Sequence, residues 1–354
     1  MTAIASPAPI QGRSRSLRLI SFSLIGIVVY FFVLMGYLML APATAEDAPA
    51  TAAQQVTNAL TIGAIYALIA LGYTMVYGII ELINFAHGDV FMVGAFLSIV
   101  FLTGISGQTG SVTDPILLTV LLIGALLFAM PLTALLNAVI ERLFYRPLRN
   151  APRLAPLITA IGVSFILQNV ALAIAGPGDV RAPQIFPLDW TISILGAQIR
   201  VLSIVILIGA ILLMVGLQQF IGRTRLGRAM RSTAQDREAA QLMGVDLNQT
   251  IALTFLLGGA MAGAAGVVWV LQFGFARQDL GFNAGLKAFT AAVLGGIGNV
   301  TGAVLGGFII GFIEVAATTF GYLRWSQALV FLVLTLVLIF RPAGILGQQL
   351  GERA

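Results

Sequence analysis

The stretch of the chain that decides its fold is residues 63–96, which read GAIYALIALGYTMVYGIIELINFAHGDVFMVGAF. Two apolar runs flank a short interval that contains Glu81, Asn84, His87 and Asp89. A helix needs about 20 mainly apolar residues to cross a bilayer. Polar groups at membrane depth are costly and tend to mark pathways. The stretch therefore predicts two membrane-spanning helices separated by a polar interruption.

The composition extends this interpretation to the whole chain. Of the 354 residues, 59% are hydrophobic and 9% are charged, and the mean hydropathy is +0.99. Soluble domains are about 45–50% apolar and about 25% charged, so this chain has too little polar surface to be soluble and is too apolar to be disordered. We predict an all-α, polytopic membrane protein with about eight to ten transmembrane helices, some of them interrupted.

The apolar runs predict where these spans lie. They cover residues 58–80, 90–103, 116–140, 154–175, 201–221, 250–273, 286–320 and 328–340. The glycine-rich run 286–320 is either one kinked helix or two shorter ones, and a cytoplasmic C-terminus at Arg341 favours a break near Gly298 and Asn299. Gly302 and Gly306, then Gly307 and Gly311, form G-x-x-x-G pairs suited to close helix contact.

The chain divides into an extension, a membrane domain and a tail. Residues 1–55 form the extension, residues 56–347 the membrane domain and residues 348–354 a short C-terminal tail. In the extension, the apolar run 19–40 is either an extra anchor helix or part of a cleavable signal peptide with a site at 43–45. The run exceeds the about 7–15 apolar residues of a signal peptide, which favours the anchor.

Positive charge sets the expected orientation. Loop 141–153 carries four arginines and loop 223–249 carries five, whereas loop 176–198 carries one. By the positive-inside rule, the two basic loops are cytoplasmic. The arginines therefore indicate membrane topology rather than a nucleic-acid surface.

Several kinds of site are excluded by residues that the chain lacks. It contains no cysteine and one histidine, so it forms no disulfide, no thiolate site and no multi-histidine metal site. No G-x-x-x-x-G-K-[ST] motif is present, so the chain does not bind ATP by that route.

The polar interval has two further interpretations. One is an ordinary cytoplasmic turn whose polar groups lie in water. The other is an intramembrane acid–base enzyme that uses His87 with Asp89 or Glu81, although no nucleophile motif accompanies them.

The pathway interpretation has support from a second interruption, GGIGN at residues 295–299. Interrupted hydrophobic segments in both halves of a transporter point to its substrate site. Glu314 either lines this pathway or pairs with Lys287 or Arg324, and we expect Lys287 to extend toward the membrane interface. The candidate pathway residues are Tyr77, Glu81, Asn84, His87, Asp89, Gly295, Gly296, Asn299 and Glu314.

The basic loop 223–249 contains a second kind of candidate site. Its segment DREAAQLMG predicts a short amphipathic helix outside the membrane, with Asp236 near the start and Gly244 at the end. A solvated basic loop is the alternative. The candidate residues of this element are Arg231, Asp236, Glu238, Ala239, Ala240 and Gly244.

Several motifs resemble those of one known family. Residues 63–96, ERLFYRPLR (141–149), ITAIGVSFILQN (158–169), GLKAFTAAVLGGIG (285–298) and RPAGILG (341–347) resemble the permease subunit of branched-chain amino-acid importers of the ATP-binding-cassette class. The resemblance covers about residues 57–347. Loop 224–245 resembles the coupling loop that touches the ATPase subunits, although Leu253 and Thr254 replace the Leu-Pro common in other importers.

The resemblance implies a multi-pass subunit in the bacterial inner (plasma) membrane that transports leucine, isoleucine and valine without catalysing a reaction. It implies a second permease subunit, as a heterodimer or homodimer, two cytoplasmic ATP-binding subunits and an extracytoplasmic substrate-binding protein. The chain itself would bind no cofactor, because its partners use the ATP. Closure of the ATPases would push a coupling helix over residues 234–243.

Other transport functions remain as alternatives. A permease of the same class could carry urea or short amides. An ion-coupled secondary transporter could use Glu81, Asp89 and Glu314 as proton carriers. That transporter and a passive channel would both lack the E-A-A-x-x-x-G segment of residues 238–244, which argues against them.

Overall fold

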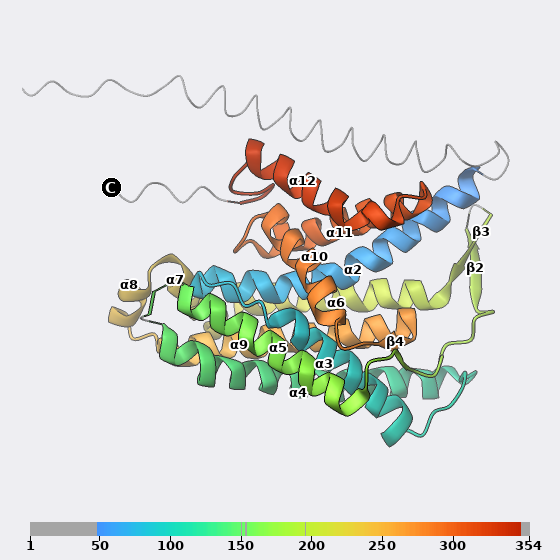
Figure 1. Ribbon diagram of the computed structural model, residues 1–354, viewed down its shortest axis with the longest axis horizontal. Helices are drawn as coiled ribbons and strands as arrows, with labels where there is room; N and C mark the ends of the chain where they lie inside the picture. Colours follow the sequence, from blue (N-terminus) through green and yellow to red (C-terminus); the bar gives the residue numbers. More distant parts are fainter. Residues whose placement is uncertain (1–47, 150, 153, 195, 348–354) are drawn as a thin grey trace, which may run out of the picture.

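The computed structural model describes residues 48–149, 151–152, 154–194 and 196–347. The expected anchor or signal segment, residues 19–40, and the tail, residues 348–354, lie outside the described residues. Within them, long helices run roughly side by side, and short segments connect them at two opposite ends (Figure 1).

The helices follow the apolar runs of the sequence. Helix α3 continues as a π-helical turn, Val100–Ile105, and α4 continues through the turns Glu141–Tyr145 and Arg146–Leu148. A short turn, Leu323–Trp325, precedes α12. The described helices are α2 (Ala48–Ile80), α3 (His87–Ile99), α4 (Pro115–Ile140), α5 (Leu154–Ala175), α6 (Val201–Arg223), α7 (Arg225–Gln235), α8 (Arg237–Leu242), α9 (Leu247–Phe273), α10 (Leu280–Gly295), α11 (Val300–Thr319) and α12 (Ser326–Phe340).

Eight of the helical segments in the described part of the chain are long and apolar enough to cross a membrane. This agrees with the predicted eight to ten. The run 286–320 is two helices, because α10 ends at Gly295 and α11 begins at Val300. The break near Gly298 and Asn299 is thus confirmed, and α10, at 16 residues, is shorter than a typical span of about 20.

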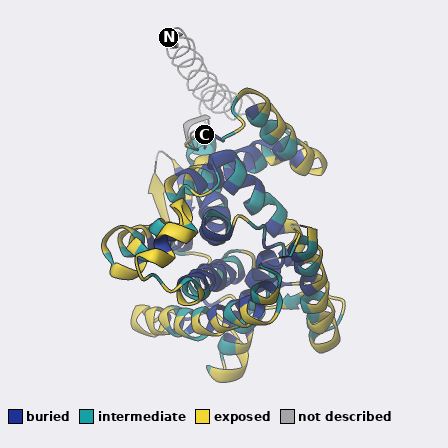
Figure 2. Ribbon diagram, turned by 90° about the vertical axis from the view of Figure 1, so that its left-hand side faces the viewer, coloured by how far each residue is buried: buried dark blue, intermediate teal, exposed yellow. Residues whose placement is uncertain are grey.

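Helix α2 lies at the centre of the bundle. In its most apolar segment 89% of the residues are buried, compared with 17% in α5 and in α12. Glycines bring α11 against it: a Cβ added at Gly307 would lie 2.5 Å from the Ala67 backbone, and one at Gly311 would lie 2.5 Å from Gly63. The G-x-x-x-G glycines therefore serve close packing, as predicted. Figure 2 shows the buried centre and the exposed outer helices.

The basic segments lie together at one end of the bundle. Helices α7 and α8 occupy this end, and the short strands occupy the other (Figure 1). There β1 (Val180–Arg181) pairs with β4 (Phe275–Ala276), and β2 (Thr191–Ile194) pairs with β3 (Ala197–Arg200), both antiparallel. The strands were not predicted. The clustering of the basic loops agrees with the orientation expected from positive charge, so we refer to the α7–α8 end as cytoplasmic.

A charged contact connects the loops at the opposite, outer end. Arg277 follows β4 and pairs with Asp279, and its distance to Asp179 beside β1 is 3.9 Å. The hydrogen bond with the Asp279 carboxylate raises the pKa of Arg277.

Candidate functional site

The first break separates α2 from α3 at the cytoplasmic end. Helix α2 ends at Ile80, and Glu81 follows with φ +54°, a left-handed conformation that directs the chain out of the helix. Asn84 is 1% exposed, and His87 and Asp89 are fully buried. The interpretation as a water-filled turn is therefore wrong for these three side chains and holds only for Glu81, which is exposed.

Asn84 belongs to a hydrogen-bond network that the sequence did not reveal. Its side-chain nitrogen donates to the Asn137 oxygen at 3.4 Å, and the Asn137 nitrogen donates to the carbonyl of Phe255 at 2.7 Å. The Tyr145 hydroxyl donates to the Asn84 oxygen at 3.1 Å. The network connects the break to α4 and α9. Asn137 was missed, although a lone amide inside the apolar run 116–140 was a usable signal.

His87 and Asp89 point into different surroundings. The His87 ring packs edge-on against Tyr73 with centroids 4.8 Å apart, and neither ring nitrogen has a hydrogen bond of good geometry, although the Ile69 carbonyl interacts with the ring. Asp89 accepts hydrogen bonds from Ser164 and, at 3.1 Å, from Gln168 on α5. Among the described residues no hydrogen bond joins His87 to Asp89 or to Glu81, so neither form of the predicted acid–base pair is observed.

The second break is built from glycine and backbone contacts. Gly296 has φ +109° and Gly298 has φ +88°, conformations that favour glycine. The Asn299 side chain accepts from the Gly302 N–H at 3.0 Å and donates to the Leu346 carbonyl at 2.8 Å. The Gly295 carbonyl accepts from the Leu346 N–H at 2.9 Å. Gly295, Gly296 and Asn299 thus hold the RPAGILG segment, a role that sequence reasoning did not anticipate.

The two breaks lie next to each other although they are about 200 residues apart in the chain. A Cβ added at Gly78 would lie 3.1 Å from the Gly298 Cα. Residues from both breaks line one small cavity. Its lining is Tyr73, Tyr77, Ile83, Asn84, Phe289, Ala292 and Ile297. The structure therefore brings together Tyr77, Asn84 and the 295–299 region of the predicted pathway.

Glu314 lies elsewhere, in the part of α11 that is remote from the break. Its carboxylate is 2.6 Å from the Lys287 amine and 2.6 Å from the Tyr66 hydroxyl, which donates to it. The Lys287 and Glu314 side chains are 15% and 17% exposed. Of the two predicted partners, Lys287 is the one observed, and the expectation that Lys287 extends to the interface is wrong because Glu314 holds it inside the bundle.

The cytoplasmic element is two helices rather than one. Asp236 ends α7 and caps α8 by accepting from the Ala239 N–H at 3.0 Å. The prediction that the coupling helix covers residues 234–243 is therefore wrong about its first residue, because Ala234 belongs to α7. Gly244, at φ +84°, follows the end of α8 as predicted.

The predicted residues of this element face different ways. Glu238 and Ala239 are exposed, Ala240 is 3% exposed, and Arg231 donates to the Ile221 carbonyl of α6. Sequence reasoning missed the apolar tip of α8, where Leu242 is 89% exposed and Met243 is 85% exposed. Two such side chains in water suggest a surface that another protein covers.

Helix α8 is connected to the first break by one hydrogen bond. Arg237 donates from Nη2 to the Ile79 carbonyl at 2.9 Å. A cation at the C-terminus of α2 also interacts favourably with the helix dipole. Arg237 was not among the predicted residues, although it lies within the predicted loop.

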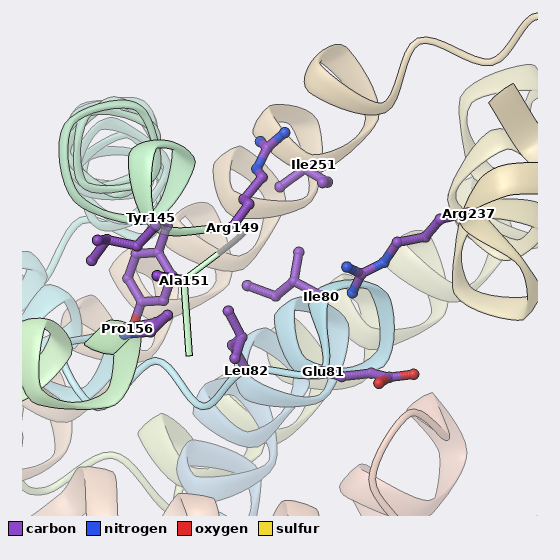
Figure 3. Close-up of a pocket in the computed structure, with 10 residues that line it drawn as sticks. Ile80, Glu81, Leu82, Tyr145, Arg149, Ala151, Pro156, Arg237 and Ile251 are labelled. Carbon is purple, nitrogen blue, oxygen red and sulfur yellow. The ribbon is translucent and has the colours of Figure 1, made fainter. Parts of the chain in front are cut away.

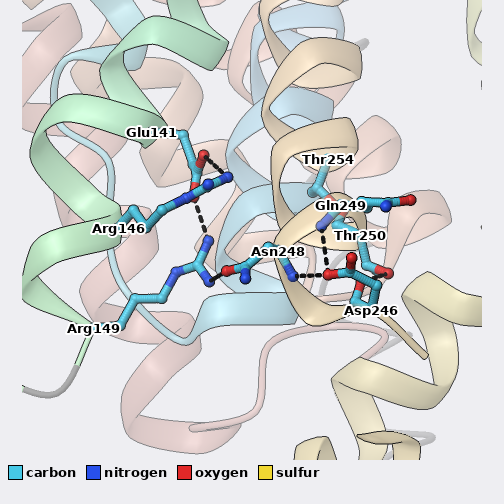
Figure 4. Close-up of polar contacts among 8 residues, drawn as sticks. All are labelled: Glu141, Arg146, Arg149, Asp246, Asn248, Gln249, Thr250 and Thr254. Atoms are coloured by element: carbon cyan, nitrogen blue, oxygen red, sulfur yellow. Dashed lines mark hydrogen bonds and ion pairs between the residues drawn. The ribbon is translucent and has the colours of Figure 1, made fainter. Parts of the chain in front are cut away.

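An ion-pair network holds the turn after α4 to the start of α9 (Figure 4). Buried Glu141 pairs with Arg149 and, at 3.2 Å, with Arg146. Arg149 also donates to Asn248 at 2.6 Å. Asp246 caps α9 by accepting from the Asn248 N–H at 2.8 Å. The network therefore fixes the end of the cytoplasmic loop against the bundle.

Comparisons with known proteins agree with this architecture. The model of a family described as the permease component of the branched-chain amino acid transport system matches residues 55–338. The chain is 43% identical over 304 residues to the high-affinity branched-chain amino acid transport system permease protein BraD of Pseudomonas aeruginosa, which covers 85% of this chain and 97% of BraD.

Two further relatives, one of them more distant, are similar over most of the chain. The chain is 42% identical over 303 residues to the permease protein LivH of the corresponding system of Escherichia coli K12, covering 85% of this chain and 97% of LivH. It is 28% identical over 261 residues to the autoinducer 2 import system permease protein LsrC of Yersinia pseudotuberculosis, covering 69% and 71%. No solved structure matches. The chain belongs to the family of branched-chain amino acid transport permease components.

Proposed function

We propose that this chain is the transmembrane permease subunit of an ATP-binding-cassette importer for leucine, isoleucine and valine. The observation that carries the proposal is the 43% identity to BraD, which extends over 97% of that permease. The chain is a multi-pass membrane protein, and we place it in the bacterial inner membrane. It catalyses no reaction and binds no cofactor of its own, because ATP is used by partner subunits.

The exposed surfaces support the proposed partners. The outward faces of α5 and α12 are apolar and fit lipid and a second permease subunit. The exposed Leu242 and Met243 on α8 fit a cytoplasmic ATPase. A pair of ATPases would serve the two permease subunits, and an extracytoplasmic binding protein would deliver the amino acid to the end where the strands lie.

The contacts suggest how ATPase closure reaches the pathway. A push on α8 moves Arg237, and Arg237 holds the Ile79 carbonyl at the end of α2. The first break, with Asn84 and its bonded neighbours, begins two residues later. We propose that this movement opens and closes the region where the two breaks meet. There Tyr77, Glu81, Asn84, His87, Asp89, Gly295, Gly296 and Asn299 would line or shape the route, whereas Glu314 would stabilise the bundle.

Uptake measurements test the substrate. Cells that lack this gene and the neighbouring transport genes would be given radiolabelled leucine, urea or a short amide, with the chain restored alone or with its partners. We expect leucine uptake only with the ATPase and binding-protein genes present. Uptake of urea or the amide instead would indicate the alternative substrates. Leucine uptake with this chain alone, abolished by collapse of the proton gradient, would indicate a secondary transporter.

A charge reversal tests the docking surface. Glu238→Lys on the exposed face of α8 should reduce co-purification of the ATPase and leucine uptake together, while the amount of permease in the membrane stays unchanged. The matched control is Asp189→Lys, another exposed acid, in the loop at the outer end. Normal ATPase co-purification with normal uptake in Glu238→Lys would contradict the proposed contact.

A further inference from the structure

A cavity of about 170 Å³ lies at the cytoplasmic end, between the end of α2, the turn after α4 and α8 (Figure 3). Its aliphatic lining comes from Ile80, Leu82, Leu148, Pro156 and Ile251. An engineered cavity of about 150 Å³ binds benzene, so this one has room for the aliphatic side chain of a small molecule.

The polar lining of the cavity is mainly cationic. It includes Arg149, Arg237 and Glu81, and the Glu81 side chain extends away from the two arginines (Figure 3). Arg149 and Arg146 share the single negative charge of Glu141, so that cluster carries one excess positive charge. The Nε of Arg149 is buried without a hydrogen-bond partner among the described residues. Such a group stabilises a bound anion, because a buried donor left unpaired is costly.

The C-terminal end of α2 supplies a partial negative charge beside the two arginines. Carbonyl groups of a helix's last turn are partly negative and favour a cation. Arg237 bonds to the Ile79 carbonyl, and Ile80, the last residue of α2, lines the cavity. The cavity thus combines an anion-binding side, an aliphatic surface and a helix C-terminus. These three features match the carboxylate, the side chain and the ammonium group of an aliphatic amino acid.

We propose that this cavity is a cytoplasmic binding site for a free aliphatic amino acid, with Arg149 and Arg237 toward the carboxylate. The proposal rests on the proposed function, because the ligand is the transported amino acid. The site is separate from the cavity where the two breaks meet. Since Arg237 belongs to α8, an amino acid bound here would contact the element proposed to receive the push of the ATPase.

The test is binding of radiolabelled leucine to the purified permease complex with its second permease and ATPase subunits, in lipid nanodiscs without ATP or binding protein. Ala151→Trp fills the cavity from its rim while it leaves both arginines in place, and we expect it to abolish binding at this site. Arg237→Gln should weaken binding by about tenfold or more, because a hydrogen bond to a charged group is lost. The matched control, Leu154→Trp, adds the same side chain at a position that is 67% exposed and outside the lining, and it should bind leucine normally.

Competitors define the chemistry of the site. Unlabelled 4-methylpentanoate, which keeps the carboxylate and the aliphatic group, should displace leucine better than leucinamide, which lacks the carboxylate. Wild-type binding by Ala151→Trp would overturn the proposal, as would no detectable binding by the wild type. Equal displacement by inorganic phosphate and by leucine would indicate a general anion site, such as one for a lipid headgroup, and would also overturn it.

Leucine uptake by the same complex, measured with the binding protein and ATP, separates the two proposals. Normal uptake without leucine binding in the cavity overturns only the cytoplasmic site. Absence of leucine uptake overturns the proposed function itself.

Discussion

The two helix breaks lie next to each other but are stabilised by different means. The α2–α3 break contains no glycine between Glu81 and Ala86, and side chains hold it: Asn84 bonds to Asn137 and Tyr145 on α4 and its extension. The α10–α11 break depends on glycines with positive φ and on backbone hydrogen bonds to the RPAGILG segment. The first break is thus sensitive to the loss of polar groups, and the second to the addition of atoms.

The helix pair α10–α11 is also joined by an ion pair away from its break. Breaking this ion pair is expected to cause the largest loss of stability. Lys287 and Glu314 join α10 to α11 by an ion pair that is mostly buried. Lys287→Met leaves the carboxylate without its cation and should destabilise the protein by about 3–5 kcal/mol. Unfolding in mixed detergent micelles, followed by tryptophan fluorescence, measures this loss.

The ion pair has two controls. Adding Glu314→Gln to Lys287→Met removes the unpaired charge and should restore most of the stability, since Gln still accepts from Tyr66. Arg324→Met removes an exposed cation and should change little. If Lys287→Met lowers the free energy of unfolding no more than Arg324→Met does, the ion pair does not stabilise the packing of α10 against α11.

Adding one methyl group to the second break is expected to have the next largest effect. In Gly296→Ala, the new Cβ would lie 2.4 Å from the Gly347 backbone nitrogen at a φ of +109°. Backbone strain and overpacking together should cost about 3 kcal/mol. Gly209→Ala in α6, where nothing lies within 4 Å, should be neutral or slightly stabilising. Equal unfolding midpoints for the two variants would contradict a glycine-dependent break.

Removing one polar group from the network at the first break should cost less. Asn137→Ala leaves the Asn84 amide and the Phe255 carbonyl without their partner, a loss of about 1–3 kcal/mol. We also expect reduced leucine uptake, because the break loses its connection to α4. Asn169→Ala, which removes an exposed amide bonded to its own helix, is the control. Unchanged stability and uptake in Asn137→Ala would show that the network is dispensable.

The smallest effect is expected for Glu81→Gly at the first break. Glycine relieves the left-handed conformation but makes the unfolded chain more flexible, so the two changes offset each other to within about 1 kcal/mol. Glu238→Gly replaces another exposed glutamate, inside α8, and should lower stability by about 1 kcal/mol because glycine disfavours helix. The same unfolding assay compares the two variants. A larger loss for Glu81→Gly than for Glu238→Gly would show that the Glu81 side chain itself holds the break.

Much of the fold could be predicted because each membrane span is a continuous run of apolar residues and can be recognised from its own sequence. Runs of apolar residues located the eight spans, and the glycines of GGIGN located the break between α10 and α11. The start of a short helix near Asp236 was predicted and is confirmed by the cap of α8. Helix α7 before it was not predicted, because its arginine-rich sequence was assigned to a loop outside the apolar runs. The strand pairs were missed because they are only two to four residues long.

The candidate site was predictable only in part. The sequence singled out Asn84, His87 and Asp89 as polar residues beside apolar runs, and the structure buries all three. It did not reveal Asn137 or Tyr145 as partners of Asn84, because these bonds join residues 53 and 61 positions apart.

The sequence by itself determined a polytopic all-α membrane protein, the positions of its two breaks and its resemblance to a permease family, and it predicted the orientation. The helical spans follow from the cost of placing polar groups and backbone in lipid, which every segment meets on its own. The orientation is predicted from the arginines of the loops, and the resemblance comes from the order of the motifs. Only the tertiary structure decided that the breaks lie together, that Lys287 pairs with Glu314 and that Arg237 holds the end of α2. Such contacts depend on how helices pack, because short-range hydrogen bonds and ion pairs form only between side chains that packing brings within a few ångströms.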